Sequence, residues 1–225
     1  MGAYKTPAKV KLVVGLLGAD REILEKTRNI LNGRFGPEEE VMAPIPFIWT
    51  RYYSEEVGGS PWRTFLSYEN LIPREDLVDI KRHTNELERQ LARDGLRRVN
   101  LDPGYLTLGQ FFLATTKDQR HRVYVRDGIF VEPTLYFQDG RFHPFEWTYR
   151  DYRSEEYRAY FEAARSKLAY QMHHQGLPYS RRKAFMGTAE AAVNPGSLDS
   201  PRQGRGEGSG GGSGSPLNST PEGGG

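Results

Sequence analysis

A carboxylate, an amide and a group of cations are concentrated in two short segments near the middle of the chain. The first, residues 98–105, contains Asn100 and Asp102, and the second, residues 116–122, follows a few positions later. Asp102 comes at the expected end of a strand, where functional side chains are common, so its carboxylate is suited to general-base chemistry. The proline and glycine after it equally favour a turn in which Asp102 only accepts backbone N–H groups. Both interpretations stay open here.

Asn100 lies two residues before Asp102, so the two side chains share one face of an extended strand. Polar groups beside a core layer need hydrogen-bond partners, which favours a polar site at this point. In the second segment, Lys117 and Arg122 are suited to hold a phosphate or a carboxylate, with the arginine as the bidentate group. The pattern predicts a site for a small anionic ligand, of the nucleotide or phosphate type, around residues 100–102. Whether the protein is also an enzyme stays open.

Three further residues, Tyr105, His121 and Glu132, are expected to contribute to this ligand site. Alternation along a strand places His121 and Arg122 on opposite faces, so only one of the two should join a given site. A hairpin turn at Asp127-Gly128 puts Glu132 opposite Val123 and within diagonal reach of His121. Carboxylate and imidazole groups suit divalent metals, but no metal-ligand spacing supports them here, and we predict no metal site.

Two other functions compete with the ligand site. Aromatic residues on an open sheet, together with arginines, are able to stack nucleic-acid bases, which predicts an RNA- or nucleotide-binding module. Core packing is the commoner role of such rings. The rings concerned are Trp49, Tyr52, Tyr53, Trp62, Phe65, Tyr68, Tyr105, Trp147, Tyr149 and Tyr152. The remaining alternative is a noncatalytic scaffold whose polar residues satisfy turns. No motif predicts a cofactor or an oligomeric state.

The elements that position these residues follow from hydrophobic periodicity and from helix-capping residues. The first half of the chain predicts the order strand, helix, strand, strand, helix, strand, which is that of the split βαβ, or ferredoxin-like, fold. The expected segments are a strand at 9–17, a helix capped by Asp20 and ended by Gly33, an irregular edge strand near 44–53, a strand at 62–68, a helix from Pro73 to Gly95, and a strand at 97–101.

The second half predicts a short helix at 107–114, capped by Thr107, and then a hairpin of strands 120–126 and 129–137. A second Asp-Gly, at 139–140, indicates one more strand, and Ser154 is placed to cap a final helix. We therefore expect an α+β protein, a ferredoxin-like sandwich extended by an antiparallel hairpin and a C-terminal helix.

Composition divides the chain into a folded part, residues 1–183, and a Gly/Ser-rich tail, residues 184–225, which holds 12 of the 25 glycines. Such a tail buries too little apolar area to offset its ordering entropy, so we expect it to be disordered. Residues 1–183 carry 29 basic and 25 acidic residues, a net charge of +4, which permits a local anion site. The lack of cysteine, of a signal peptide and of a membrane-spanning run is typical of a cytoplasmic protein.

The chain resembles a bacterial family catalogued as domain of unknown function 4416. The resemblance covers about residues 5–172, and its most specific piece is the run Asn100 to Tyr105. Its other pieces are Pro46-Phe47, Thr50, Tyr52-Tyr53, Thr116-Lys117, residues 121–124 and residues 147–149. Members of that family have been labelled GTP-binding, but this chain has no Gly-x-x-x-x-Gly-Lys-Ser/Thr loop, and residues 116–118 lack the spacing of a guanine-reading element. The resemblance itself implies no activity.

Overall fold

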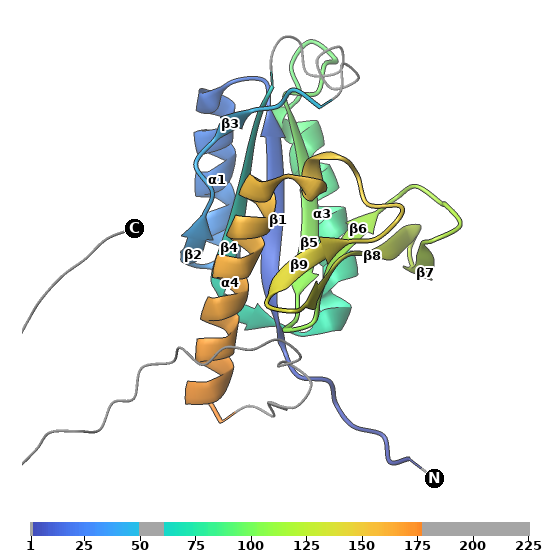
Figure 1. Ribbon diagram of the computed structural model, residues 1–225. Helices are drawn as coiled ribbons and strands as arrows, with labels where there is room; N and C mark the ends of the chain where they lie inside the picture. Colours follow the sequence, from blue (N-terminus) through green and yellow to red (C-terminus); the bar gives the residue numbers. More distant parts are fainter. Residues whose placement is uncertain (1, 50–60, 177–225) are drawn as a thin grey trace, which may run out of the picture. The chain divides into compact units, whose positions relative to one another are not determined.

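The computed structural model describes residues 2–49 and 61–176. In this part the protein is α+β, with nine strands in one antiparallel sheet and three α-helices packed on it (Figure 1). In chain order the elements are β1 (Val10–Gly18), α1 (Arg21–Phe35), β2 (Glu38–Val41), β3 (Ile45–Pro46), β4 (Trp62–Ile72), the 3₁₀ turn η1 (Arg74–Asp76), α3 (Leu77–Leu91), β5 (Val99–Leu106), β6 (Gln110–Thr115), β7 (Val123–Arg126), β8 (Ile129–Gln138), β9 (Arg141–Pro144), the 3₁₀ turn η2 (Asp151–Arg153) and α4 (Glu155–His174).

The sheet runs in the order β2-β4-β1-β5-β6-β8-β7, with β3 added to β4 and β9 added to β8. Both faces are covered, because α4 lies across one face and α1 and α3 across the other (Figure 1). Alternate residues of the central strand serve the two cores: Val13 packs in the cluster that includes α4, and Leu12 and Val14 pack in the cluster that includes α1 and α3. A buried strand of this kind explains why β1 is a continuous apolar run.

Asp20 and Ser154 cap α1 and α4 as expected, but α3 begins at Leu77, after a 3₁₀ turn, and not at Pro73. Two of the expected helix ends are also wrong. Asp20 accepts a hydrogen bond from the Ile23 N–H at 2.8 Å and caps α1 as expected. The helix continues past Gly33 to Phe35 and ends at Gly36, whose φ of 93° suits a glycine. Likewise α3 ends at Leu91, before the turn that contains Gly95.

The helix expected at 107–114 is also wrong, because residues 110–115 form β6. The Thr107 hydroxyl accepts hydrogen bonds from the N–H groups of Gly109 and Gln110, so it stabilises a tight turn between β5 and β6. Phe111 and Leu113 then face the same core, which is the period of a strand. The expected helix cap is therefore wrong as well, and the Thr107 hydroxyl stabilises a hairpin turn instead.

A fork in the sheet creates the space for a site. β1 pairs with β5 along all of Val99–Leu106, whereas β6 pairs with β5 only from Gly104 to Leu106. Pro103 is the first residue beyond this pairing, and it has no N–H to donate to a neighbouring strand. At Gly104 a Cβ atom would lie 2.2 Å from the Phe112 carbonyl oxygen, so only glycine permits this close approach. The turn expected at residues 103–104 is therefore wrong, since both residues belong to β5.

None of the helices in the described segments is both long enough and apolar enough to span a membrane. The predicted tail, residues 184–225, lies outside the described residues.

Candidate functional site

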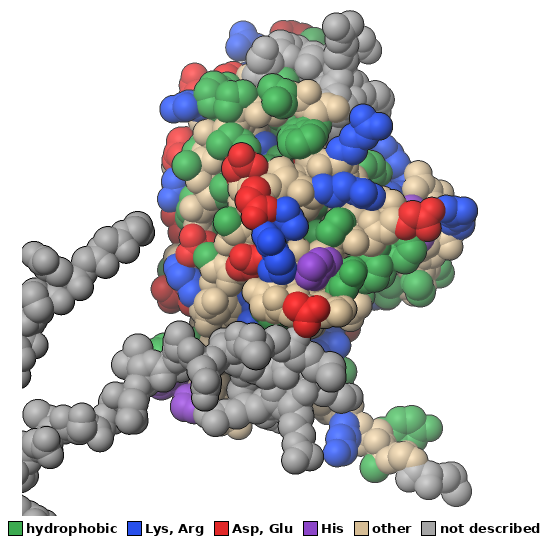
Figure 2. All heavy atoms as spheres, in the orientation of Figure 1, with side chains coloured by type: hydrophobic (Ala, Val, Ile, Leu, Met, Phe, Trp, Pro, Cys, Tyr) green, Lys and Arg blue, Asp and Glu red, His purple; other side chains and the backbone are tan. Residues whose placement is uncertain are grey.

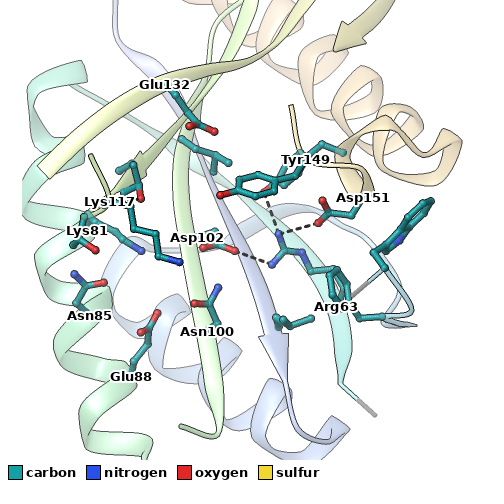
Figure 3. Close-up of a pocket in the computed structure, with 18 of the residues that line it drawn as sticks. Arg63, Lys81, Asn85, Glu88, Asn100, Asp102, Lys117, Glu132, Tyr149 and Asp151 are labelled. Atoms are coloured by element: carbon teal, nitrogen blue, oxygen red, sulfur yellow. Dashed lines mark hydrogen bonds and ion pairs between the residues drawn. The ribbon is translucent and has the colours of Figure 1, made fainter. Parts of the chain in front are cut away.

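A pocket of about 600 Å³ occupies the fork between β5 and β6. Its floor is the face of β5 that carries Asn100 and Asp102, and its walls come from α3, from the segment after β6 and from the segment before α4 (Figure 3). The lining residues are Leu17, Phe47, Trp49, Arg63, Lys81, Asn85, Glu88, Arg97, Asn100, Asp102, Leu113, Ala114, Thr115, Thr116, Lys117, Arg122, Glu132, Tyr149, Arg150, Asp151 and Tyr152.

Five of the seven predicted site residues line this one pocket: Asn100, Asp102, Lys117, Arg122 and Glu132. The other two do not. Tyr105 packs beside α3 in a separate cluster and against the ring of Phe112, and His121 contacts Glu132 from outside the lining. Tyr105 differs because an odd number of positions separates it from Asn100 and Asp102, so alternation along β5 directs it elsewhere.

Asp102 is fixed by a buried arginine from another strand. Arg63, on β4, is 3% exposed and donates from Nη1 to Asp102 Oδ2 at 2.9 Å across the central strand. This reach depends on Gly15, because a Cβ atom there would lie 2.9 Å from the Phe65 ring and 3.3 Å from Arg63 Cζ. Arg63 also donates to the Tyr152 hydroxyl at 3.1 Å and lies 3.9 Å from Asp151 Oδ2.

The two carboxylates beside Arg63 differ in their titration. Burial raises the pKa of the Asp151 carboxyl above its usual value, and repulsion from Asp102 adds to this effect. Burial acts in the same direction on Asp102, but attraction by Arg63 and Lys81 outweighs it and holds the pKa of Asp102 below its usual value. Asp102 is therefore an ionised carboxylate at neutral pH, and its side chain is still 26% exposed.

On the opposite wall, Glu132 contacts both His121 and Arg122, although only one of these two was expected to join the site. Its Oε2 accepts from Arg122 Nε at 2.6 Å and lies 3.0 Å from His121 Nε2. The expected alternation is wrong because β7 begins only at Val123, so His121 and Arg122 lie in a turn. The expected pairing of Val123 with Glu132 is wrong as well, since a β-bulge shifts the register and places Val123 opposite Val131.

Side chains of α3, in place of a strand, form hydrogen bonds with the unpaired edge of β5. Glu88 Oε1 accepts from the Leu101 N–H at 2.6 Å, and Lys81 Nζ donates to the Leu101 carbonyl at 2.8 Å. Burial raises the pKa of the Glu88 carboxyl. Sequence reasoning missed both residues, although both are buried. Their spacing was the available signal, because residues seven apart lie on one helix face.

Asn100 leaves a donor in the pocket. The residue is 7% exposed, and its Oδ1 accepts from Arg97 Nη1 at 2.9 Å. Its Nδ2 is buried and makes no hydrogen bond of normal geometry with a described residue, although it lies close enough to the Asp102 carboxylate to help hold the pKa of that group below its usual value. Most buried polar atoms are hydrogen-bonded, so this amide is a donor available to a ligand. Figure 3 shows Asn100, Asn85 and Lys117 directed toward the same part of the pocket.

The aromatic rings are divided between core and surface. Phe65, Tyr68 and Tyr152 are buried, whereas Trp49 and Tyr149 are exposed at the pocket. Tyr52 and Tyr53 lie outside the described residues. Because α4 covers the face of the sheet that the ferredoxin-like expectation would leave open, these rings do not form a sheet-wide stacking surface, which argues against the nucleic-acid alternative.

The lining provides no cluster of three or more His, Asp or Glu side chains suited to hold a metal ion, and neither does any other region among the residues with described positions.

Comparison with known proteins gives one match. The family model described as a domain of unknown function, DUF4416, matches residues 8–168, which include every strand and helix from β1 through most of α4. No curated protein and no solved structure matches the chain.

Proposed function

We propose that the pocket binds a small anionic ligand of the phosphate or nucleotide type. The chain belongs to the DUF4416 family, whose description names no activity, so the proposal rests on the chemistry of the pocket. The observation that carries this proposal is the Asn100 Nδ2 donor, buried without a hydrogen bond of normal geometry to a described residue, in a pocket whose lining includes six basic and four acidic residues. A donor of this kind and an excess of positive charge both favour an anion.

Each of the four acidic residues of the lining already has at least one partner. Asp102 is paired through Oδ2 with Arg63, Glu132 through Oε2 with Arg122, and Glu88 with the Leu101 N–H, while Asp151 lies 3.9 Å from Arg63. Of the basic residues, Arg150 has a side chain that makes no hydrogen bond or ion pair with a described residue, and it is exposed and lines the pocket. Figure 2 shows basic side chains gathered over the segment between β9 and η2, to which Arg150 belongs. An incoming anion would therefore meet positive charge before it reaches Asn100.

We also propose the finer fold assignment, a ferredoxin-like split βαβ unit formed by β1-α1-β2 and β4-α3-β5. The antiparallel order β2-β4-β1-β5 supports it, because the third strand is inserted between the two strands of the first unit. β6 to β9 and α4 would be the extension. A cytoplasmic location remains part of this proposal on the strength of the cysteine-free composition.

Binding is tested by isothermal titration calorimetry and thermal shift with inorganic phosphate, nucleoside monophosphates and sugar phosphates. A ligand that binds only the folded protein raises the melting temperature. We expect Arg150→Ala to weaken binding of a responding phosphate compound about tenfold, the worth of one charge-assisted hydrogen bond. Asn100→Ala should weaken it by a similar factor.

The matched control is Arg34→Ala, which removes an exposed arginine on α1 without touching the pocket. It should leave both the affinity and the melting temperature unchanged. Equal affinities of the wild type, Arg150→Ala and Asn100→Ala would refute this pocket as the anion site, and so would the absence of any response to the whole panel.

A further inference from the structure

The pocket contains acidic groups that an anion alone does not explain. Asp102 uses Oδ2 for Arg63, and Glu132 uses Oε2 for Arg122. The second oxygen of each carboxylate, Asp102 Oδ1 and Glu132 Oε1, makes no ion pair with a described residue, and the one neutral donor close to the Asp102 carboxylate is the Asn100 amide. Both residues line the pocket, Asp102 from β5 and Glu132 from β8 (Figure 3). Each arginine therefore holds a carboxylate in place while one of its oxygens is left for another group.

An ionised carboxylate is only an acceptor, so the part of a ligand that meets Asp102 must carry O–H or N–H donors. Charged amines are disfavoured, because the six basic residues of the lining outnumber the four acidic ones. Uncharged donors remain, hydroxyl groups among them, and O–H bonds to a carboxylate are among the strong hydrogen bonds of proteins.

A ring at the pocket provides an apolar surface beside these acceptors. Tyr149 is 48% exposed, and its hydroxyl is held by Arg122 Nη2 at 3.2 Å, so its ring is fixed in orientation. The C–H groups of a sugar or polyol chain can pack on such a ring while their hydroxyls bond to carboxylates. The site thus combines a cationic part at Asn100 and Arg150 with a hydroxyl-accepting part at Asp102 and Glu132.

We propose that the ligand of this pocket is a phosphorylated sugar or polyol, with its phosphate in the cationic part and its hydroxyls on the carboxylates. This inference rests on the proposed anion-binding function and narrows it to a ligand class. It requires that the hydroxyl-bearing part contributes affinity of its own, beyond that of the phosphate.

Titration calorimetry on the wild-type protein tests this requirement with ligands of equal charge. Propyl phosphate, which has no hydroxyl on its chain, is compared with glycerol phosphate and with pentose and hexose monophosphates. We expect the best hydroxylated compound to bind at least about tenfold more tightly than propyl phosphate, because one hydroxyl–carboxylate bond is worth about that factor.

Two variants localise the effect. Asp102→Asn should bring the affinity ratio of the best sugar or polyol phosphate to propyl phosphate close to one, and because both ligands are measured on the same variant, a general loss of affinity leaves this ratio unaffected. Tyr149→Ala, a change at an exposed residue that should preserve the fold, is expected to lower the same ratio. Binding of propyl phosphate and all hydroxylated phosphates with equal affinity would overturn this inference and leave the anion site standing. Failure of every phosphate, inorganic phosphate included, would overturn both.

Discussion

At the scale of single residues, the pocket depends on how one buried cation is neutralised. Arg63 is almost fully buried, and its charge is balanced by Asp102 at 2.9 Å, with Asp151 at 3.9 Å as a second, weaker neighbour. Removing one member of a buried ion pair lowers the free energy of unfolding by more than the pair contributes to it, since the other charge is left without compensation. Asp102 is therefore both a structural partner of Arg63 and the ionised group that faces the ligand space.

We predict that Asp102→Asn lowers the free energy of unfolding at neutral pH by about 3 kcal/mol. The pKa of Asp102 is depressed in the folded protein. Its stabilising contribution is thus fully present above the unfolded pKa of about 3.9, and it is lost as the pH falls through the lower folded value. The difference between wild type and variant should shrink over this acidic range.

Urea unfolding of both proteins at a series of pH values measures this difference. Glu146→Gln, which alters an exposed carboxylate outside the pocket, is the control and should leave the stability curve unchanged. A gap between wild type and Asp102→Asn that stays constant down to the lowest pH would show that the charge of Asp102 does not stabilise the fold.

At the scale of elements, side chains of α3 bond to the edge of β5 where no strand pairs with it. β6 pairs with β5 only over residues 104–106. The backbone of Leu101, which lies beyond this pairing, is bonded by the side chains of Glu88 and Lys81. Exposed backbone groups at a strand edge would otherwise need water or another strand. Since the helix satisfies the edge with side chains, the fork stays open and the pocket has room.

We predict that Glu88→Ala destabilises the protein by about 1–3 kcal/mol, because the buried Leu101 N–H loses its acceptor. Glu88→Gln keeps an amide oxygen at that position and should recover most of the loss. Hydrogen exchange measured at the Leu101 amide, together with urea unfolding, distinguishes the two variants. Unchanged protection of this amide in Glu88→Ala would contradict the role assigned to α3.

At the scale of the whole molecule, two cores on opposite faces of one sheet are joined through β1. Val13 and Phe65 pack with the α4 side, and Leu12 and Leu66 with the α1 and α3 side. The family match ends at residue 168, within α4, so the part of the chain common to the family coincides closely with these two cores.

We predict that a chain truncated after residue 183 unfolds at the same temperature as the full chain. Residues 184–225 are rich in Gly and Ser, and they contain too few apolar side chains to contribute to a core. Differential scanning calorimetry of both forms measures this. A melting temperature lower by several degrees in the truncated form would mean that the tail contributes to stability.

Much of the architecture could be predicted from local sequence signals. The apolar run of β1, the Asp20 cap and the Asp127-Gly128 turn each depend on neighbouring residues alone, and each prediction was correct. Within the site, Asn100 and Asp102 were placed together for the same reason, since alternation along one strand needs no distant partner.

Only the tertiary structure could decide the rest. Residues 110–115 became a strand because the neighbouring strands β5 and β8 offered pairing, and Arg63 reached Asp102 because Gly15 left space across β1. Lys81 and Glu88 joined the site because β6 departs from β5 at Pro103, a geometry that no local pattern encodes. The sequence by itself determined the Asp20 cap of α1, the hairpin turn at Asp127-Gly128 and the shared face of Asn100 and Asp102. The fork, the pairing of buried charges and the pocket were decided by contacts between elements far apart in the chain, because hydrogen-bond and charge partners are fixed only when the elements pack.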